Sequence, residues 1–201
     1  MIKTTVDPTR LLVLADLLFL QARALSPPGA GEGSVAAVSD HELDDLVTRS
    51  GIDRESANEL IGLLSAVRAC APESWSSEYA RLFDGAQACP PNETAYVRRD
   101  KGVILADIAA FYRAFGFDVA KGSSEKADHI VAELQFVALL HVKLARALAA
   151  DEDEHAETTR RALEAFVTDH LGCWIDAFRA RLTEVAELDL YTWISHTLDV
   201  T

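Results

Sequence analysis

The amino-acid sequence predicts an all-α protein, a single-domain bundle of roughly eight to ten helices in two halves. Apolar residues recur with helical period in almost every segment, as in helices that bury one face. No segment alternates convincingly between apolar and polar residues, and no Asn-Gly type hairpin turn is present. We expect a single domain over residues 1–201, with an N-terminal half at about 1–116, a hinge at about 117–124 and a C-terminal half at about 125–201.

The N-terminal half contains four predicted helices with explicit start signals. Asp7-Pro8 places an N-cap residue before a proline at the first helical position, and the Pro- and Gly-rich stretch 26–34 ends that helix. Ser39-Asp40-His41-Glu42 matches a capping box and starts a second helix. Asp53 is placed to cap a third helix, and Pro72 to open a fourth.

The rest of the chain alternates loops and helices. Residues 84–100 are predicted to form a long irregular connection. A loop of this length in a compact domain is usually functional or disordered. The next helix is placed to end at Gly116, and the longest helix follows the 117–124 loop. An acidic turn at 151–154 separates it from two further helices, and a short helix around Tyr191 closes the chain.

Composition limits the classes of partner. The formal net charge is −13, while 49% hydrophobic and 25% charged residues are typical of a globular protein. A chain this acidic is repelled by phosphate backbones, so we expect no nucleic-acid partner; it attracts basic partners, although acidity also serves solubility alone. Cys70, Cys89 and Cys173 match neither a zinc motif nor a disulfide framework, so we expect reduced thiols.

Neither export nor stable membrane insertion is expected from the sequence. The N-terminus lacks a signal-peptide pattern, because Asp7-Pro8 and Asp16 interrupt its apolar residues. No apolar stretch approaches the roughly 20 residues that a spanning helix needs. We therefore expect a cytoplasmic protein.

The most informative stretch is 124–136, where acidic side chains and an imidazole precede a strongly apolar helix. Spacings of four residues predict that Glu125, His129 and Glu133 share one helical face, with Asp128 roughly 100° around it. The helix dipole alone favours acidic groups in a first turn, and a histidine bonded to a neighbouring carboxylate or carbonyl is an ordinary structural feature. The pattern therefore fits a structural cluster as well as a binding site.

Five separated motifs follow one another along the chain. They are Glu78-Tyr79-x-Arg81-Leu82-Phe83, Pro90-Pro91-x-Glu93-Thr94-x-Tyr96, Phe111-Tyr112-x-x-Phe115-Gly116-Phe117, Glu125-x-x-Asp128-His129 with Glu133-Leu134, and Phe166-x-x-x-His170-Leu171-x-x-Trp174. In order and spacing they resemble the TorD/DmsD family of redox-enzyme maturation chaperones, over most of residues 75–195. The chain departs from the family pattern at Ala127, where a proline is usual, which relaxes the hinge backbone.

The resemblance implies a chaperone and not an enzyme, with no catalytic residue, metal or cofactor of its own. Its partners would be the catalytic subunit of a molybdopterin-dependent oxidoreductase and the twin-arginine leader of that subunit. Capture of the leader would hold back export until the molybdenum cofactor is inserted. The resemblance also permits a guanine nucleotide as a weak partner, and a domain-swapped dimer as well as a monomer is conceivable.

Peptide-binding residues follow from the chemistry of such a leader. Guanidinium groups pair bidentately with carboxylates, which Glu93, Glu125 and Asp128 can supply beside His129. The apolar stretch of the leader requires a groove, and the candidate lining residues are aromatic: Trp75, Tyr79, Phe83, Tyr96 and Tyr112. Ordinary core packing is the alternative for each of these aromatics. If the cluster binds the leader, Asp128→Ala and His129→Ala should weaken binding while leaving the melting temperature nearly unchanged.

Two other functions fit the same residues. One is an assembly chaperone of the nitrate-reductase branch, which needs no twin-arginine leader. The other is a helical metalloenzyme that uses Glu125, His129 and Glu133 as ligands. A client without the arginine pair would favour the first, and stoichiometric metal lost on His129→Ala would favour the second.

Overall fold

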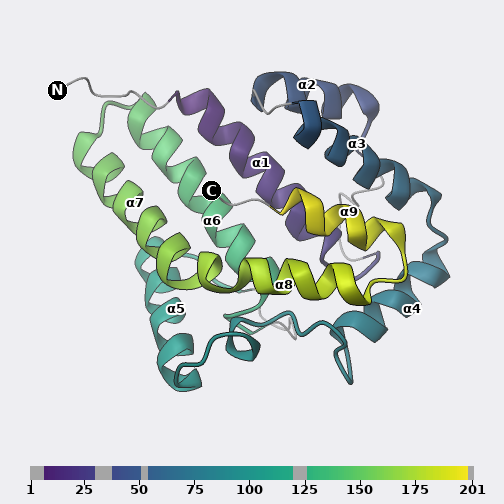
Figure 1. Cartoon of the computed structure of the whole chain (residues 1–201). Helices are drawn as coiled ribbons and strands as arrows, with labels where there is room; N and C mark the ends of the chain where they lie inside the picture. Colours follow the sequence, from purple (N-terminus) through teal and green to yellow (C-terminus); the bar gives the residue numbers. More distant parts are fainter. Residues whose placement is uncertain (1–6, 30–37, 51–53, 120–125, 199–201) are drawn as a thin grey trace.

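The computed structural model describes residues 7–29, 38–50, 54–119 and 126–198, and these residues form an all-α fold without strands. The α-helices, shown in Figure 1, are α1 (Pro8–Ala24), α2 (Asp40–Ser50), α3 (Arg54–Ala69), α4 (Pro72–Phe83), α5 (Lys101–Phe115), α6 (Ile130–Ala149), α7 (Asp153–Phe166), α8 (Gly172–Val185) and α9 (Asp189–Thr197). The predicted all-α, single-domain class is confirmed, and the helices of the described residues fall within the predicted range. None of these helices combines the length and apolar character needed to cross a bilayer.

Most predicted helix boundaries are confirmed by their capping bonds. The Asp7 carboxylate accepts a hydrogen bond from the backbone N–H two residues on, at 2.9 Å. Ser39 and Glu42 cap each other reciprocally: the Glu42 carboxylate accepts from the Ser39 N–H at 2.8 Å, and the Glu42 N–H donates to the Ser39 hydroxyl at 3.2 Å. Gly116 ends α5 with a left-handed φ of +67°, which glycine adopts without steric cost. The predicted cap Asp53 lies outside the described residues.

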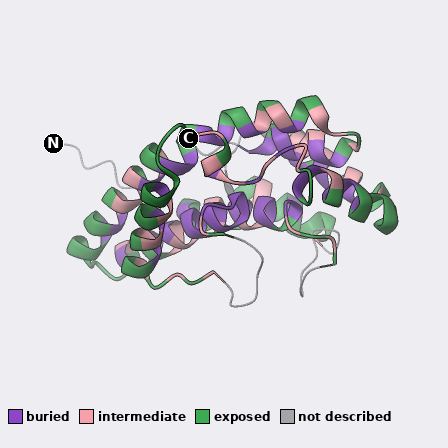
Figure 2. Ribbon diagram, turned by 90° about the horizontal axis from the view of Figure 1, so that it is seen from below, coloured by how far each residue is buried: buried purple, intermediate pink, exposed green. Residues whose placement is uncertain are grey.

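The N-terminal and C-terminal halves of the chain pack against each other. α1 lies along α6, α3 lies against α9, and α7 packs on the other side of α6 (Figure 1). A main core cluster takes buried residues from α1 through α6 to the C-terminal helices, and Figure 2 shows the buried positions on the facing sides of the helices. Helices from before and after residues 117–124 therefore contribute to one core.

A π-helical segment, η3 (Val167–Leu171), joins α7 to α8. The sequence predicted two separate helices here. In the structure the backbone stays helical from Asp153 to Val185, and its η3 turn is wider than an α-helical turn. Gly172 follows the wide turn, and a Cβ added at Gly172 would lie 2.5 Å from the carbonyl oxygen of Val167. The absence of a side chain at Gly172 therefore permits the turn, and π turns occur frequently at functional sites.

Candidate functional site

The 90–96 loop is fastened to the turn that precedes α6. Most of residues 84–100 are irregular, as predicted, with one short 3-10 turn, η2 (Glu93–Ala95). The Glu93 N–H donates to the Asp128 carbonyl at 2.9 Å, and the Ile130 N–H donates to the Pro91 carbonyl at 2.8 Å. Asn92 and His129 form an isolated antiparallel bridge. Two motifs about 40 residues apart in sequence thereby meet in one structural unit.

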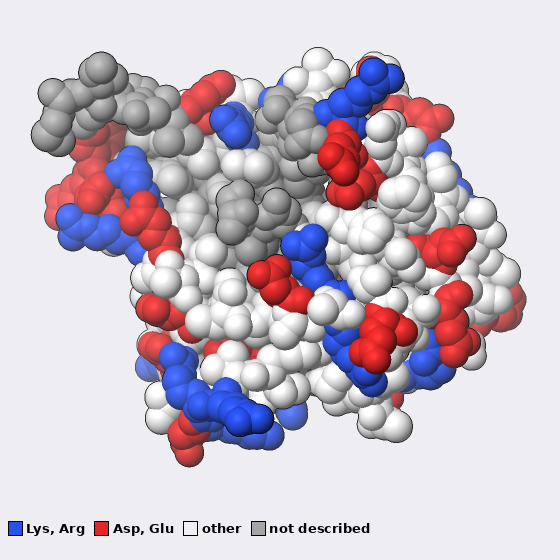
Figure 3. Space-filling view, in the orientation of Figure 1, with Lys and Arg blue, Asp and Glu red and all other residues white. Residues whose placement is uncertain are grey.

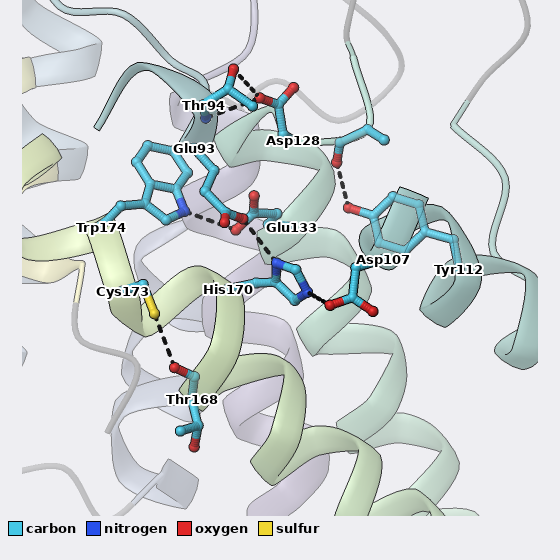
Figure 4. Close-up of polar contacts among 11 residues, drawn as sticks. Glu93, Thr94, Asp107, Tyr112, Asp128, Glu133, Thr168, His170, Cys173 and Trp174 are labelled. Carbon is cyan, nitrogen blue, oxygen red and sulfur yellow. Dashed lines mark hydrogen bonds and ion pairs between the residues drawn. The ribbon is translucent and has the colours of Figure 1, made fainter. Parts of the chain in front are cut away.

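Asp128 is a fully buried anchor of this unit. Its carboxylate accepts from the Asn92 side-chain amide at 3.1 Å. It also accepts from the Thr94 N–H at 3.2 Å and from the Thr94 hydroxyl at 2.7 Å (Figure 4). Asp128 lies in the turn before α6 and not in the first turn of a helix, because α6 begins only at Ile130. Its oxygens are therefore occupied by the protein itself, and a bound guanidinium would have to displace these donors.

His129 caps α6. Its Nδ1 accepts from the Val131 N–H at 3.2 Å, and only 8% of the residue is exposed. Burial lowers the pKa of His129 to about 4, against the opposing effect of the neighbouring Asp128 charge. The predicted shared face of Glu125, His129 and Glu133 is wrong, because the helix starts after His129. Glu125 itself lies outside the described residues.

A buried carboxyl cluster, defined here as Glu93, Glu133, His170 and Trp174, lies beneath this loop (Figure 4). His170 Nδ1 lies 3.0 Å from Glu93 Oε2, and the Trp174 indole N–H donates to Glu133 Oε2 at 3.0 Å. On the other edge of the imidazole, His170 Nε2 lies 3.4 Å from a carboxylate oxygen of Asp107 on α5, whose side chain is 49% exposed. The cluster therefore joins the 90–96 loop, α6, η3, α8 and α5.

The electrostatics of this cluster are dominated by its burial. Glu133 is fully buried, and burial raises its pKa well above the ordinary value, with the neighbouring Glu93 charge acting in the same direction. The Trp174 hydrogen bond opposes the rise. Burial therefore favours the neutral, protonated form of the Glu133 carboxyl.

The aromatic candidates are mostly core residues. Trp75, Tyr79, Phe83 and Tyr112 are buried, whereas Tyr96 is half-buried and stacks on the Trp174 ring with centroids 5.4 Å apart. Trp75 donates its indole N–H to the Tyr191 hydroxyl at 3.1 Å, and the Tyr79 and Phe83 rings meet edge to face at 5.2 Å. These contacts match the core-packing alternative, so their rings stabilise the fold whatever else they contact.

Tyr112 connects the core to a surface pocket. Its hydroxyl donates to the Ala127 carbonyl at 2.8 Å, in the turn before α6 (Figure 4). Its ring also lines a pocket of about 410 Å³ at the C-terminal end of α5, together with Ala109, Arg113, Gly116, Phe117, Asp118 and Val119. Phe117 and Val119 are half-buried and Asp118 is exposed, so the pocket combines an apolar wall with an accessible carboxylate.

The first motif holds α4 to the C-terminal helices. Arg81 donates twice to the buried Glu78 carboxylate at 2.7 Å and once to the Val185 carbonyl at 2.6 Å. Glu78 also accepts from the Glu187 N–H at 2.7 Å. This motif therefore binds the backbone of the segment that joins α8 to α9.

The surface carries charges of both signs. On the face in Figure 3, acidic side chains are scattered between basic ones, and a group of basic side chains gathers at the lower left, where Figure 1 places α5. The formal net charge of −13 nevertheless gives the molecule a negative far field that attracts basic peptides.

Sequence reasoning included only part of this site. Glu93, Asp128 and His129 were predicted to lie together, and the structure brings them together. His170 and Trp174 were recognised only as a spacing motif, whereas both reach into the cluster from η3 and α8. Asp107 had no signal, because an exposed helical aspartate with no motif around it is indistinguishable from any solvated one.

Comparisons with known proteins cover most of the chain. Residues 50–180 match a family model described as the nitrate reductase delta subunit. A selenate reductase assembly chaperone protein of Thauera selenatis is 33% identical over 114 residues, which are 55% of this chain and 58% of that protein. A chlorate reductase assembly chaperone protein of Ideonella dechloratans is 32% identical over 114 residues, 55% and 58% of the two chains. The chaperone protein TorD of Vibrio cholerae is 32% identical over 159 residues, 75% of this chain and 69% of that one.

The matched lengths differ between these relatives. The chain spans 58% of the length of the selenate and chlorate reductase chaperones, against 69% of the TorD protein. All five motifs lie within residues 50–180, the part that the family model matches.

Proposed function

The chain belongs to the nitrate reductase delta subunit family, and from this premise we propose that it is an assembly chaperone for the catalytic subunit of a redox enzyme. The resemblance to TorD-type chaperones is confirmed by the family match and by the identity to TorD. The relatives are named as chaperones and not as enzymes, in agreement with the expectation of a non-catalytic protein. Binding is then the whole of the mechanism.

The finer proposal is that the protein binds a twin-arginine leader in the cytoplasm and delays export until the molybdenum cofactor is inserted. The observation that carries it is the pocket at the end of α5, which combines an apolar wall with the exposed Asp118. Through Tyr112 the pocket adjoins the turn that holds Asp128 and His129, where the family motif lies. An extended or helical peptide with an apolar stretch fits such a groove.

The predicted carboxylates therefore have different roles from those expected from the sequence. Glu93 and Asp128 are completely buried, so they shape the site from beneath, while Asp118 offers the accessible carboxylate for a leader arginine. A bidentate guanidinium–carboxylate pair is stronger than an ammonium–carboxylate pair at the same site. We expect a leader affinity near micromolar, roughly −8 kcal/mol, which retains the client and still allows release.

Titration calorimetry with a synthetic twin-arginine leader tests this function. We expect binding near micromolar strength, weakened when both arginines are replaced by lysine, because lysine keeps the charge and loses the planar fork. Absence of detectable binding to leaders from several molybdenum enzymes would contradict the leader proposal.

The second candidate is a chaperone of the nitrate-reductase branch, acting on a subunit without a twin-arginine leader. The description of the matched family as the nitrate reductase delta subunit favours it. In that case the protein should bind the apo catalytic subunit equally well with and without its N-terminal segment, measured by co-purification of the two versions.

A further inference from the structure

The buried carboxyl cluster contains polar atoms that the rest of the protein leaves without a hydrogen bond. Among the described residues, Glu93 Oε1, Glu133 Oε1 and His170 Nε2 are buried and accept or donate no hydrogen bond, although the last faces the Asp107 carboxylate at 3.4 Å. All three side chains have no exposed surface. Unpartnered buried polar atoms are rare and costly, so their gathering in one cluster calls for a physical explanation.

The two carboxyl groups cannot both be ionised at this site. Glu93 and Glu133 adjoin each other in Figure 4, and the charge on Glu93 raises the cost of ionising Glu133. The Trp174 indole supplies one donor to Glu133, and the His170 imidazole faces Glu93. Two adjacent buried anions with so few donors would be strongly destabilising, whereas a single proton between them gives both orphan oxygens a partner.

We infer that Glu93 and Glu133 share one proton, held on Glu133, and that this shared proton fastens the 90–96 loop to α6. Glu93 then remains the acceptor for the His170 Nδ1–H group, and Glu133 the acceptor for Trp174 and the donor to Glu93. Glu133 and its partners are thus positioning residues, which hold the loop and the Asp128 turn in place.

Several titratable groups face the shared proton. They are Asp107 and Tyr112 on α5, Asp128 in the turn before α6, His170 in η3 and Cys173 in α8, with Arg99 and Asp169 beyond Cys173. The carboxylates among them disfavour a second negative charge, in the same direction as burial. Arg99 acts on Cys173 from outside the cluster, so it contributes less to the neutralisation of the pair.

Loss of this proton should destabilise the folded protein. Because the pKa of Glu133 is raised in the folded state above the ordinary value of 4.5, its stabilising contribution is complete below that value. The contribution is lost as pH rises toward the raised pKa. The unfolded chain releases the proton more readily, so rising pH favours unfolding.

Infrared spectroscopy on the whole chain tests the shared proton without any peptide. The wild-type protein at neutral pH should show the carbonyl stretch of a protonated carboxylic acid, and this band should be missing from Glu133→Gln. Glu164→Gln, the same change at an exposed position of α7, should keep the band. Absence of the band from the wild type would overturn the inference, even if Glu133→Gln failed to fold.

The pH dependence of urea unfolding gives a second reading. The amide that replaces the Glu133 carboxyl in Glu133→Gln still offers an N–H to Glu93, so this variant should fold and lose the decline in stability that the wild type shows as pH rises above the ordinary carboxyl pKa of 4.5. A Glu133→Gln profile parallel to the wild type would overturn the inference. The shared proton bears on the proposed function only because it would hold the binding site in place. The two can fail separately: the infrared band tests the shared proton whether or not a leader binds, and calorimetry tests leader binding whether or not the band is present.

Discussion

At the residue scale, Asp128 illustrates how burial changes the expected effect of a substitution. The sequence suggested a surface carboxylate whose removal would weaken peptide binding and leave the fold intact. The structure instead places the carboxylate inside the protein, with Asn92 and Thr94 as donors. The family motif around Asp128 is therefore explained by a structural anchor, which shapes a binding surface from below.

Asp128→Ala should destabilise the protein strongly. The substitution leaves the Asn92 amide and two Thr94 donors without acceptors in a buried site, which costs roughly 3 kcal/mol or more. Asp128→Asn keeps one acceptor oxygen and should lose less. Urea unfolding followed by circular dichroism measures both. An unchanged urea midpoint for Asp128→Ala would instead support Asp128 as a surface carboxylate that binds the peptide.

The titration of His129 should make the folded protein less stable as pH falls. Its pKa is lowered from 6.5 to about 4 in the folded state, so its contribution is present above the ordinary value and is lost as pH falls toward the folded value. The loss amounts to at most roughly 3 kcal/mol over this window. Thermal melts across the same window should show it.

Substitutions at His129 separate its cap from its titration. His129→Asn preserves an N-cap acceptor and should abolish the acid-side loss, whereas His129→Ala removes the cap and costs about 1 kcal/mol at neutral pH. An acid-side loss that persists in His129→Asn would assign the titration to another group.

Which buried side chains contact one another was the feature that the sequence predicted least well. Glu93 and Glu133 lie 40 positions apart in sequence and His170 a further 37, so no local pattern reveals that they meet. The motif spacings marked the segments as special but gave no information about which side chains turn inward. Only the packing of α5, α6, η3 and α8 around the loop decides that.

At the element scale, helix boundaries with a capping mechanism were predictable. The Asp7-Pro8 start, the Ser39–Glu42 box and the Gly116 stop all depend on local chemistry, and the structure confirms them. Two features failed. The start of α6 was placed too early because acidic residues before a helix resemble its first turn, and the π segment was invisible because its apolar period is nearly that of an α-helix.

Gly172→Ala should disturb the π segment. The added methyl would sit 2.5 Å from the Val167 carbonyl oxygen, so the backbone of η3 must shift and carry His170 away from Glu93. We expect a loss of roughly 1–3 kcal/mol, measured by urea unfolding. Gly102→Ala is the matched control, since its methyl would meet only the Asp100 side chain, at 3.1 Å, in an exposed first turn. Equal stability of the two variants would show that η3 tolerates the methyl.

At the scale of the whole molecule, the two halves form one packed body. α1 contacts α6 and α3 contacts α9, so helices from the first part of the sequence complete the core of those from the second. Four of the five motifs lie around the 90–96 loop and the end of α5, and the first motif holds α4 to the C-terminal helices.

The most direct test of the account is titration of the twin-arginine leader against two charge-matched variants. Asp118→Lys alters the pocket, and Asp44→Lys makes the same charge change on α2, on the opposite side of the molecule in Figure 1. We predict that Asp118→Lys weakens binding about tenfold or more, because a charge-assisted pair becomes a repulsion, while Asp44→Lys stays within about twofold of the wild type. Equal affinities for the two variants would contradict a leader site at the end of α5.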